Sequence, residues 1–263
     1  MEIFITVLVT FIAGAGAGLG TGFAGMIAAV VIAPLLHTFL GVDAYMAIGI
    51  ALASDVLASA VSSITYGIHK NLDIKHGLLM LVSVLLFTVL GSFLGSLLPS
   101  VALGGASTFM TILLGIKFVV KPVTTTKEGM LSVSKKKRIV GSLVCGALIG
   151  LVCGFVGAGG GIMMLIILTM VLGYELKTAV GTSVFIMTFT ALAGSVSHFV
   201  IAGAPDWLIF GLAVGFTFIW AQIASVIANR AKPKTLNTVL GIILIVIGAV
   251  VLVFNIINWV TPA

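Results

Sequence analysis

Asp55 is the residue best placed in this sequence to do chemistry, because it lies near the middle of the apolar stretch 43–69. A carboxylate at the centre of a membrane helix costs about 2.5–3.5 kcal/mol to insert, so an acid kept there is a functional candidate. Ser59, Ser62 and Tyr66 follow on the same helix face. Burial disfavours the charged form of a carboxylate. Asp55 could therefore carry a proton, or it could simply bond to Ser59 or to an N–H group at a helix break.

Hydroxyl groups lie in a second apolar stretch, 175–203, which holds Thr182, Ser183 and Thr190. Hydroxyl and backbone N–H donors suit an oxyanion, and we expect Thr182 and Ser183 to contact a substrate. His198 lies near the end of this stretch. It is either a proton-exit residue or a packing histidine with a local hydrogen bond.

Enzyme chemistry has little support in the sequence. No HExxH motif is present, and no nucleophile lies beside an evident base. His69, Asp73 and His76 occur in the segment HKNLDIKH, but their spacing fits no strong metal template, and a solvated loop is the simpler interpretation. We therefore predict a protein that is not an enzyme and has no catalytic residue, metal site or cofactor.

The composition restricts the class of protein. The chain has 263 residues, of which 60% are hydrophobic and 8% charged, and its mean hydropathy is +1.34. A soluble domain carries about 25% charged residues. We predict a multi-pass protein of the cell (plasma or inner) membrane. The net charge of +6 then reports topology and does not indicate nucleic acid. The expected partners are a small anionic substrate and the lipid bilayer, and nothing indicates an oligomeric state.

Breaks in hydrophobicity divide the chain into helical segments. A helix crosses about 30 Å of hydrocarbon with about 20 residues, and most segments fit one crossing. Segments 2–40 and 139–172 are too long and carry glycines near the middle, so each is expected to be a pair of helices. The segments are 2–40, 43–69, 75–98, 101–120, 139–172, 175–203, 206–229 and 235–259.

The basic residues test this interpretation. If 139–172 enters the membrane and returns to the same face, all thirteen Lys and Arg residues fall on one side, as the positive-inside rule requires. The loops left on the other side, 40–43, 98–101 and 203–206, contain no base. The thirteen are Lys70, Lys75, Lys117, Lys121, Lys127, Lys135, Lys136, Lys137, Arg138, Lys177, Arg230, Lys232 and Lys234.

An internal repeat relates the two halves of the chain. A shift of 132 residues aligns 18–49 with 150–181 without a gap, and ten of the 32 positions are identical. Each copy is followed by three crossings, an odd number, so the halves insert in opposite senses. We predict an all-α polytopic membrane protein with two inverted repeats, each a broken helix pair followed by three transmembrane helices. The first repeat covers 1–120, a basic cytoplasmic linker 121–138, and the second repeat 139–263.

The glycines of each repeat lie where the long segment must break. A helix that restarts near Gly159 has an N-terminus inside the membrane, and the equivalent region of the first repeat offers a second one. The first N–H groups of a helix lack internal partners and attract anions. The alternative is that the glycines only allow close helix packing. The glycines expected to bind substrate are Gly22, Gly25, Gly157, Gly159, Gly160 and Gly161.

The motifs GFVGAGGG at 154–161 and KTAVGTS at 177–183 resemble the TauE/SafE family of sulfite-exporter-like permeases. The similarity covers about residues 5–255. The resemblance implies export of sulfite or of an organosulfur anion such as sulfoacetate. Pro34 matches the family's proline after the glycine motif, whereas the second half has Ile166 there, so the two half-sites are not equivalent.

The function expected from these features is secondary transport of a small sulfur-containing anion outward, by alternating access with proton or potential coupling. Asp55 and His198 are the candidate coupling residues. A passive anion channel or permease for another small anion is the alternative, because it needs the same helix ends but no coupling acid.

Overall fold

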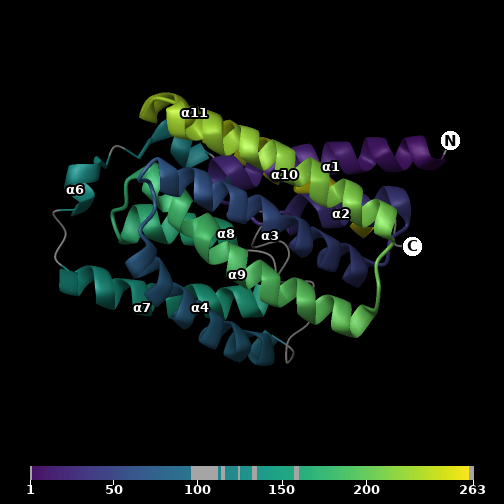
Figure 1. Cartoon of the computed structure of the whole chain (residues 1–263), viewed down its shortest axis with the longest axis horizontal. Helices are drawn as coiled ribbons and strands as arrows, with labels where there is room; N and C mark the ends of the chain where they lie inside the picture. The colour runs from purple at the N-terminus through teal and green to yellow at the C-terminus, as the bar shows by residue number, and fades with distance from the viewer. Residues whose placement is uncertain are drawn as a thin grey trace.

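The computed structural model describes residues 2–95, 112–113, 116–123, 125–131, 135–156 and 160–260. Within these ranges the secondary structure consists of helices and the turns between them, and most of the helices run roughly along the long axis of the molecule (Figure 1). The expectation of an all-helical chain is therefore confirmed for the described residues.

Five of the described helices are long and apolar enough to cross a membrane. They agree closely with the segments expected from hydropathy. Two further helices of 22 residues, α4 (Ile74–Gly95) and α7 (Lys135–Val156), accompany them. The five are α1 (Glu2–Ala24), α3 (Ala44–Ile68), α9 (Leu176–Ala202), α10 (Trp207–Arg230) and α11 (Pro233–Val260).

The outer faces of these helices are apolar. Ile64 is 62% exposed, Leu86 63% and Val200 79%. A water-soluble monomer rarely exposes large contiguous apolar patches, whereas lipid chains contact them without cost. The chain is therefore a multi-pass membrane protein.

The first long segment is divided as expected. After α1, the chain leaves helical geometry at Gly25 and resumes as α2 (Ala29–Leu40). The twelve residues of α2 span about 18 Å, which is less than the hydrocarbon thickness of about 30 Å. The pair therefore consists of one full-length and one half-length helix.

The second long segment has the same plan. After α7, the seven-residue helix α8 (Gly160–Ile166) continues into the five-residue π-helical segment η1 (Ile167–Val171). Helix α2 and the helical segment formed by α8 and η1 end in the same way, each followed by a glycine in the left-handed conformation, Gly41 and Gly173. The N–H of Val42 bonds to Leu36 O at 3.3 Å, and that of Tyr174 bonds to Leu168 O at 2.8 Å. In both cases the N–H bonds to the carbonyl six residues earlier, which is typical of a helix that ends at a glycine C-cap.

Helices α3 and α9 pack against each other and run antiparallel. A Cβ at Gly49 of α3 would lie 3.0 Å from His198 Cβ near the end of α9, and one at Gly181 near the start of α9 would lie 2.8 Å from Tyr66 Cβ. Between these contacts Thr188 donates to Ser59 at 3.1 Å. The two longest polar stripes of the chain therefore lie next to each other.

Two further helix pairs flank this centre: α1 with α10, and α4 with α7. Glycines allow the close approach in both. A Cβ at Gly18 of α1 would lie 2.6 Å from Thr217 O on α10, and one at Gly150 of α7 would lie 2.4 Å from Val84 O on α4. Glycines spaced four apart are a common contact surface between membrane helices.

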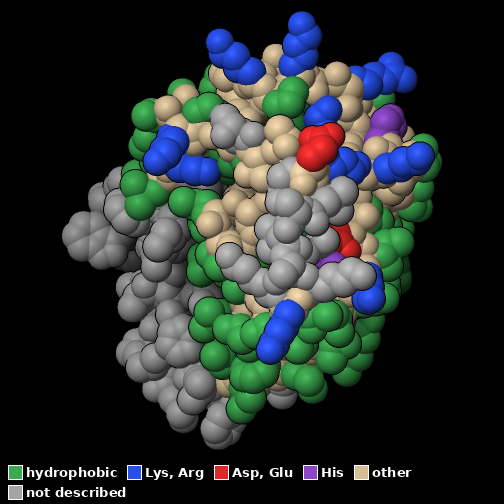
Figure 2. Space-filling model, turned by 90° about the vertical axis from the view of Figure 1, so that its left-hand side faces the viewer, with side chains coloured by type: hydrophobic (Ala, Val, Ile, Leu, Met, Phe, Trp, Pro, Cys, Tyr) green, Lys and Arg blue, Asp and Glu red, His purple; other side chains and the backbone are tan. Residues whose placement is uncertain are grey.

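The basic residues gather at one end of the molecule. Lys177 Nζ donates to Asn229 O at 2.8 Å, and Lys127 Nζ donates to Lys70 O and to Asn71. The first contact joins the start of α9 to the end of α10, and the others join Lys127 to the turn after α3. Asn71 of that turn donates to Asn229, so these segments lie together. Figure 2, which shows this end, displays Lys and Arg side chains around it. We call this the basic end.

Some expectations fall wholly or partly outside the described residues. Most of segment 101–120 does, as does the proposed outer loop 98–101. Of the linker 121–138, the structure describes residues 121–123 and 125–126, the short helix α6 (Lys127–Leu131) and residues 135–138, which form the first turn of α7. The division into two repeats with a linker stays a prediction.

Candidate functional site

The first helix break places a backbone turn inside the protein. Gly25 has a φ of +61°, a conformation that only glycine adopts readily, and its N–H bonds to Thr21 O at 2.9 Å. Helix α2 then begins after Ala28, which has no side-chain cap. Ser, Thr, Asp or Asn normally caps such an end. The start of α2 therefore needs a partner from elsewhere in the fold.

Asp55 of α3 supplies that partner. Its carboxyl group is fully buried. Oδ1 lies 3.0 Å from Thr21 Oγ1, and the backbone N–H of Ala28 is directed toward the same group. Of the two expectations for Asp55, the contact with a break is therefore observed directly. A proton-carrying role stays a prediction.

The hydrogen bonds around Asp55 are incomplete. Thr21 Oγ1 also lies 2.9 Å from Met26 O, so a single hydroxyl proton serves two acceptors. Within the part of the chain that the structure describes, Asp55 Oδ2 has no hydrogen-bond partner, and neither does Ser62 Oγ two turns along α3. A buried carboxylate ion needs several donors or a cation, and this arrangement offers it few.

The rest of the polar stripe faces protein, as expected. Ser59 and Tyr66 are fully buried. Ser59 contacts Thr188 of α9, and Tyr66 donates from its hydroxyl to Gly22 O at 2.9 Å. The stripe on α3 therefore joins α1, through Asp55 and Tyr66, to α9, through Ser59.

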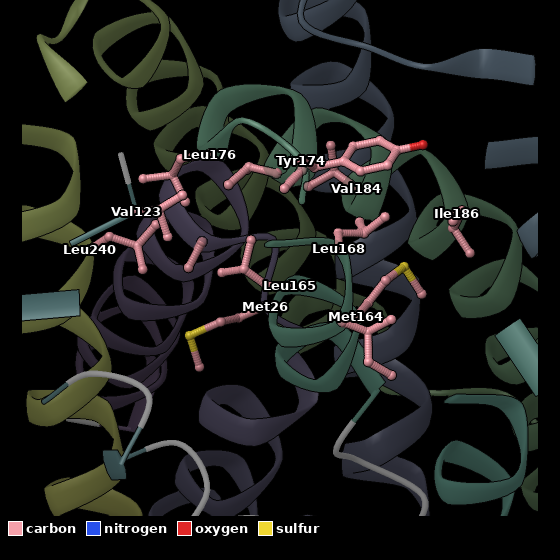
Figure 3. Packing of buried hydrophobic residues seen from close by; sticks show 14 of the residues in the cluster. Met26, Val123, Met164, Leu165, Leu168, Tyr174, Leu176, Val184, Ile186 and Leu240 are labelled. Carbon is pink, nitrogen blue, oxygen red and sulfur yellow. The ribbon is translucent and has the colours of Figure 1, made fainter. Parts of the chain in front are cut away.

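The second break meets the first. A Cβ at Gly161 in α8 would lie 2.5 Å from Gly25 O and 3.1 Å from the N of Ile27. Ser183 on α9 completes the contact, with its hydroxyl 3.4 Å from Gly25 O. Figure 3 shows Met26 from the first break in the buried cluster that also contains Leu165 of α8 and Leu168 of η1. The two interrupted helices are therefore in direct contact.

The glycines singled out in the sequence have different positions. Gly25 and Gly161 lie at the meeting of the breaks. Gly22 packs against α10, where a Cβ would lie 2.5 Å from Ala224 Cβ. Gly160 is the first residue of α8. Gly157 and Gly159 lie outside the described residues.

Thr182 and Ser183 do not share a site in this conformation. Ser183 faces the break, whereas Thr182 lies toward the α3–α4 turn and accepts a hydrogen bond from the N–H of Asp73 at 3.2 Å. Consecutive helix residues point about 100° apart, so one helix face cannot present both. Thr190 donates to Met187 O on its own helix.

His198 lies near the other end of α9 from Lys177. Its Nδ1 bonds to Gly194 O at 2.9 Å, and its ring stacks on Tyr45 with centroids 4.3 Å apart. These are the contacts of a packing histidine. Its proposed part in proton exit stays a prediction.

The basic end contains a polar junction that sequence reasoning missed. Tyr174 donates to Asp73 Oδ2 at 2.9 Å, and Asp73 also bonds to His76. Asn71 donates to Asn229 at 2.7 Å. The expectation of a solvated HKNLDIKH loop therefore holds for the exposed His69, Lys70 and Lys75. It is wrong for Asn71 and His76, which are largely buried, and Asn71 and Asp73 bond to the second half of the chain. Within the described part of the chain, no group of three or more potential ligands could hold a metal ion.

The ionisation of Asp73 reflects this junction. Burial alone raises the pKa of a carboxyl group, but hydrogen bonds from His76 and Tyr174 outweigh it and lower the pKa of Asp73 below its usual value of 3.8. The junction therefore favours the charged carboxylate.

A pocket of about 240 Å³ opens next to this junction. Its walls come from the linker, the start of α9 and the start of α11, and two lysines face it. It is lined by Val123, Thr125, Thr126, Lys127, Glu175, Leu176, Lys177, Pro233 and Leu236.

Thr21 is the other residue that sequence reasoning missed. It is the single hydroxyl residue between Gly14 and Gly25, and this isolation among glycines and apolar residues was the available signal. Its partner Asp55 could not be identified from spacing, since 34 positions separate them.

Comparison with known proteins gives a consistent result. Probable membrane transporter protein YunE of Bacillus subtilis (strain 168) is 25% identical over 265 residues, covering 94% of this chain and 96% of that protein. Probable membrane transporter protein MJ0441 of Methanocaldococcus jannaschii is 24% identical over 249 residues, covering 88% and 87%. The family described as sulfite exporter TauE/SafE matches residues 10–251. With its helices and broken segments described above, the chain belongs to the sulfite exporter TauE/SafE family of membrane transport proteins.

Proposed function

We propose that this protein is a secondary transporter that moves a small sulfur-containing anion, such as sulfite or sulfoacetate, out of the cell by alternating access. The observation that carries the proposal is the contact between the two interrupted helices, where Gly161 lies against Gly25 and Ile27, and the Ser183 hydroxyl lies 3.4 Å from Gly25 O. Interrupted helices near mid-membrane are a common way for transporters to present backbone donors to a substrate.

The proposal includes an inverted repeat. The shift of 132 residues that aligns the two halves also relates their contacts. It converts the Gly49–His198 contact into the Gly181–Tyr66 contact, and the packing of α1 on α10 into that of α7 on α4. Two oppositely oriented halves can exchange conformations and so open the same site to either face in turn.

The proposed orientation places the basic end in the cytoplasm, as the positive-inside rule predicts. The opposite end has Asp43 and Asp206 as helix caps in the turns before α3 and α10. Lys127 and Lys177 beside the pocket at the basic end would then attract an anion from the cytoplasm.

The substrate site is proposed at the breaks, with Ser183 as a side-chain donor and Gly25 and Gly161 as the positions that let the backbone approach. Gly160, the first residue of α8, belongs to the same proposed site. Substrate contacts of Gly22, Gly157, Gly159 and Thr182 stay predictions from the sequence, and in this conformation Gly22 packs on α10 and Thr182 bonds to the α3–α4 turn. Asp55 and His198 are the proposed coupling residues.

Flux of labelled sulfite, sulfoacetate and thiosulfate in proteoliposomes tests the proposal. We expect saturable flux of at least one of them, faster when unlabelled anion is present on the opposite side, because a carrier exchanges substrate and a channel does not. Absence of flux for all three would refute the substrate class, and flux without exchange would favour a channel.

A matched pair of serines on α9 tests the site. Ser183→Ala removes the donor at the break and is expected to weaken apparent affinity about tenfold, which is the usual effect of losing one hydrogen bond to a charged group. Ser197→Ala removes an exposed hydroxyl that bonds only to Ala193 O and should leave flux unchanged. Equal effects of both changes would contradict the assignment.

A further inference from the structure

The start of α2 is already occupied by an acid of the protein itself. Asp55 lies at the uncapped N-terminus of α2, with the N–H of Ala28 directed toward it. A helix N-terminus carries about half a positive charge and attracts anions. The carboxylate of Asp55 therefore takes the position that a substrate oxyanion would take.

The surroundings of Asp55 fit its neutral form better than its ion. Among the described residues, Oδ2 has no donor although the side chain is fully buried. On the other side, the Thr21 hydroxyl has one proton for both Met26 O and Asp55 Oδ1. If Thr21 donates to Met26 O, then a protonated Asp55 can donate to Thr21, and the buried carboxyl group no longer carries a charge that lacks partners.

No cation faces Asp55 from the described residues. The helices packed around it carry their ionisable side chains elsewhere: α1 has none after Glu2, and Thr21 is its contact. Besides Asp55, the ionisable side chains that lie on this set of helices or cap them are Asp43, Tyr45, Tyr66 and His69 of α3, His37 of α2, Glu175, Lys177 and His198 of α9, and Asp206 and Arg230 of α10. The hydroxyl of Tyr66 donates its hydrogen bond to Gly22 O.

We propose that Asp55 and the substrate oxyanion compete for the N–H groups at the start of α2, so that the anion binds there only when Asp55 is protonated. The ionised carboxylate holds the N–H groups and repels the anion. Protonation removes the charge, and the vacated donors with Ser183 then receive the oxyanion. Anion and proton consequently bind together and cross the membrane together.

This inference rests on the proposed transport function and adds its coupling. No bond is made or broken except the O–H of Asp55, whose proton comes from water on one side and is released on the other. Efflux of the anion is then accelerated when the inside is more acidic than the outside.

Thiosulfate is a suitable probe because its charge does not change between about pH 6 and pH 8. Any proton taken up on binding is therefore bound by the protein and not by the anion. We expect the wild-type protein in detergent or nanodiscs to take up about one proton per thiosulfate bound, measured with a pH indicator in weak buffer. Its affinity should fall about tenfold per pH unit once Asp55 ionises.

Asp55→Asn tests the assignment to this residue. The amide stays neutral, so thiosulfate binding and efflux should no longer depend on pH and proton uptake should be lost. Asp43→Asn is the matched control, since Asp43 only caps α3 through Tyr45 and Met46, and it should keep the wild-type pH dependence.

The outcomes separate this inference from the transport proposal. Thiosulfate binding by the wild type without proton uptake would overturn the coupling and leave transport intact, and it does not depend on any variant folding. Unchanged pH dependence in Asp55→Asn would also overturn it. Absence of binding and flux for every sulfur anion would instead overturn the proposed function.

Discussion

At the scale of single residues, two buried or partly buried aspartates have opposite environments. Asp55 lies within α3, and Asp73 lies in the turn between α3 and α4. Asp55 has one shared hydroxyl and one backbone N–H directed toward it, whereas Asp73 receives bonds from Tyr174 and His76. The partners of Asp73 favour its charged form, whereas the role proposed above for Asp55 requires its charge to change.

The lowered pKa of Asp73 predicts that the polar junction at the basic end loses stability in acid. A carboxyl group whose pKa is lower in the folded protein stabilises the fold above its unfolded pKa of 3.8, and the stabilisation is lost as the pH falls through the folded value. We expect the melting temperature of the wild type in detergent to decrease as the pH falls from about 5 to about 3.

Asp73→Asn serves as the test variant for that pH dependence. It should be less stable than the wild type at neutral pH and should lose less stability on acidification, because the amide does not titrate. A parallel decrease for both proteins would show that other carboxyl groups cause the acid effect.

At the scale of helices, glycine determines how closely they approach. Gly18 and Gly215 are both in the interior of long helices, yet they differ in surroundings. A Cβ at Gly18 would lie within 2.7 Å of backbone atoms of Thr217 and Ala221, while one at Gly215 meets nothing within 4 Å. The same residue type therefore has a packing role on α1 and none on its partner α10.

This contrast predicts opposite effects of the same substitution. Gly18→Ala should lower the free energy of unfolding by about 1–3 kcal/mol, because backbone atoms cannot move aside without separating the helices. Gly215→Ala should be neutral or stabilise by up to about 1 kcal/mol through helix propensity. Unfolding by SDS titration in mixed micelles measures both, and a destabilised Gly215→Ala would contradict the explanation.

At the scale of the whole molecule, bases from both halves of the chain lie at one end. Asn71, in the turn after α3 that also holds Lys70, donates to Asn229, the residue before Arg230, so the bases of that turn and those after α10 share a face. This is the result that the positive-inside argument requires, and a single crossing by 139–172 would not produce it.

Cysteine labelling tests the orientation in the membrane. In a background without Cys145 and Cys153, Ala204→Cys should react with an impermeant maleimide on intact cells. Lys70→Cys and Lys232→Cys should react only after permeabilisation, since both residues are exposed at the basic end. Labelling of the last two on opposite faces would refute the arrangement proposed for the helices.

Much of the fold could be predicted from the sequence, because its signals are local. Apolar length gives the position of a crossing, and a glycine-rich interruption in a segment too long for one crossing gives a break. The bounds of α3, α9, α10 and α11 agree with hydropathy to within a few residues. The half-length of α2 did not follow, because a full-depth pair has the same charge pattern.

The candidate site was predictable only in part. The sequence by itself determined that Asp55 is buried with a polar stripe and that glycines interrupt two helices, since insertion cost and backbone freedom depend on the residue and its neighbours. Only the tertiary structure decided which groups meet: Asp55 with Thr21, Gly161 with Gly25, and Ser183 but not Thr182 with the break. Those pairings depend on how antiparallel helices cross and how far each rotates about its axis, and residues far apart in the chain set both.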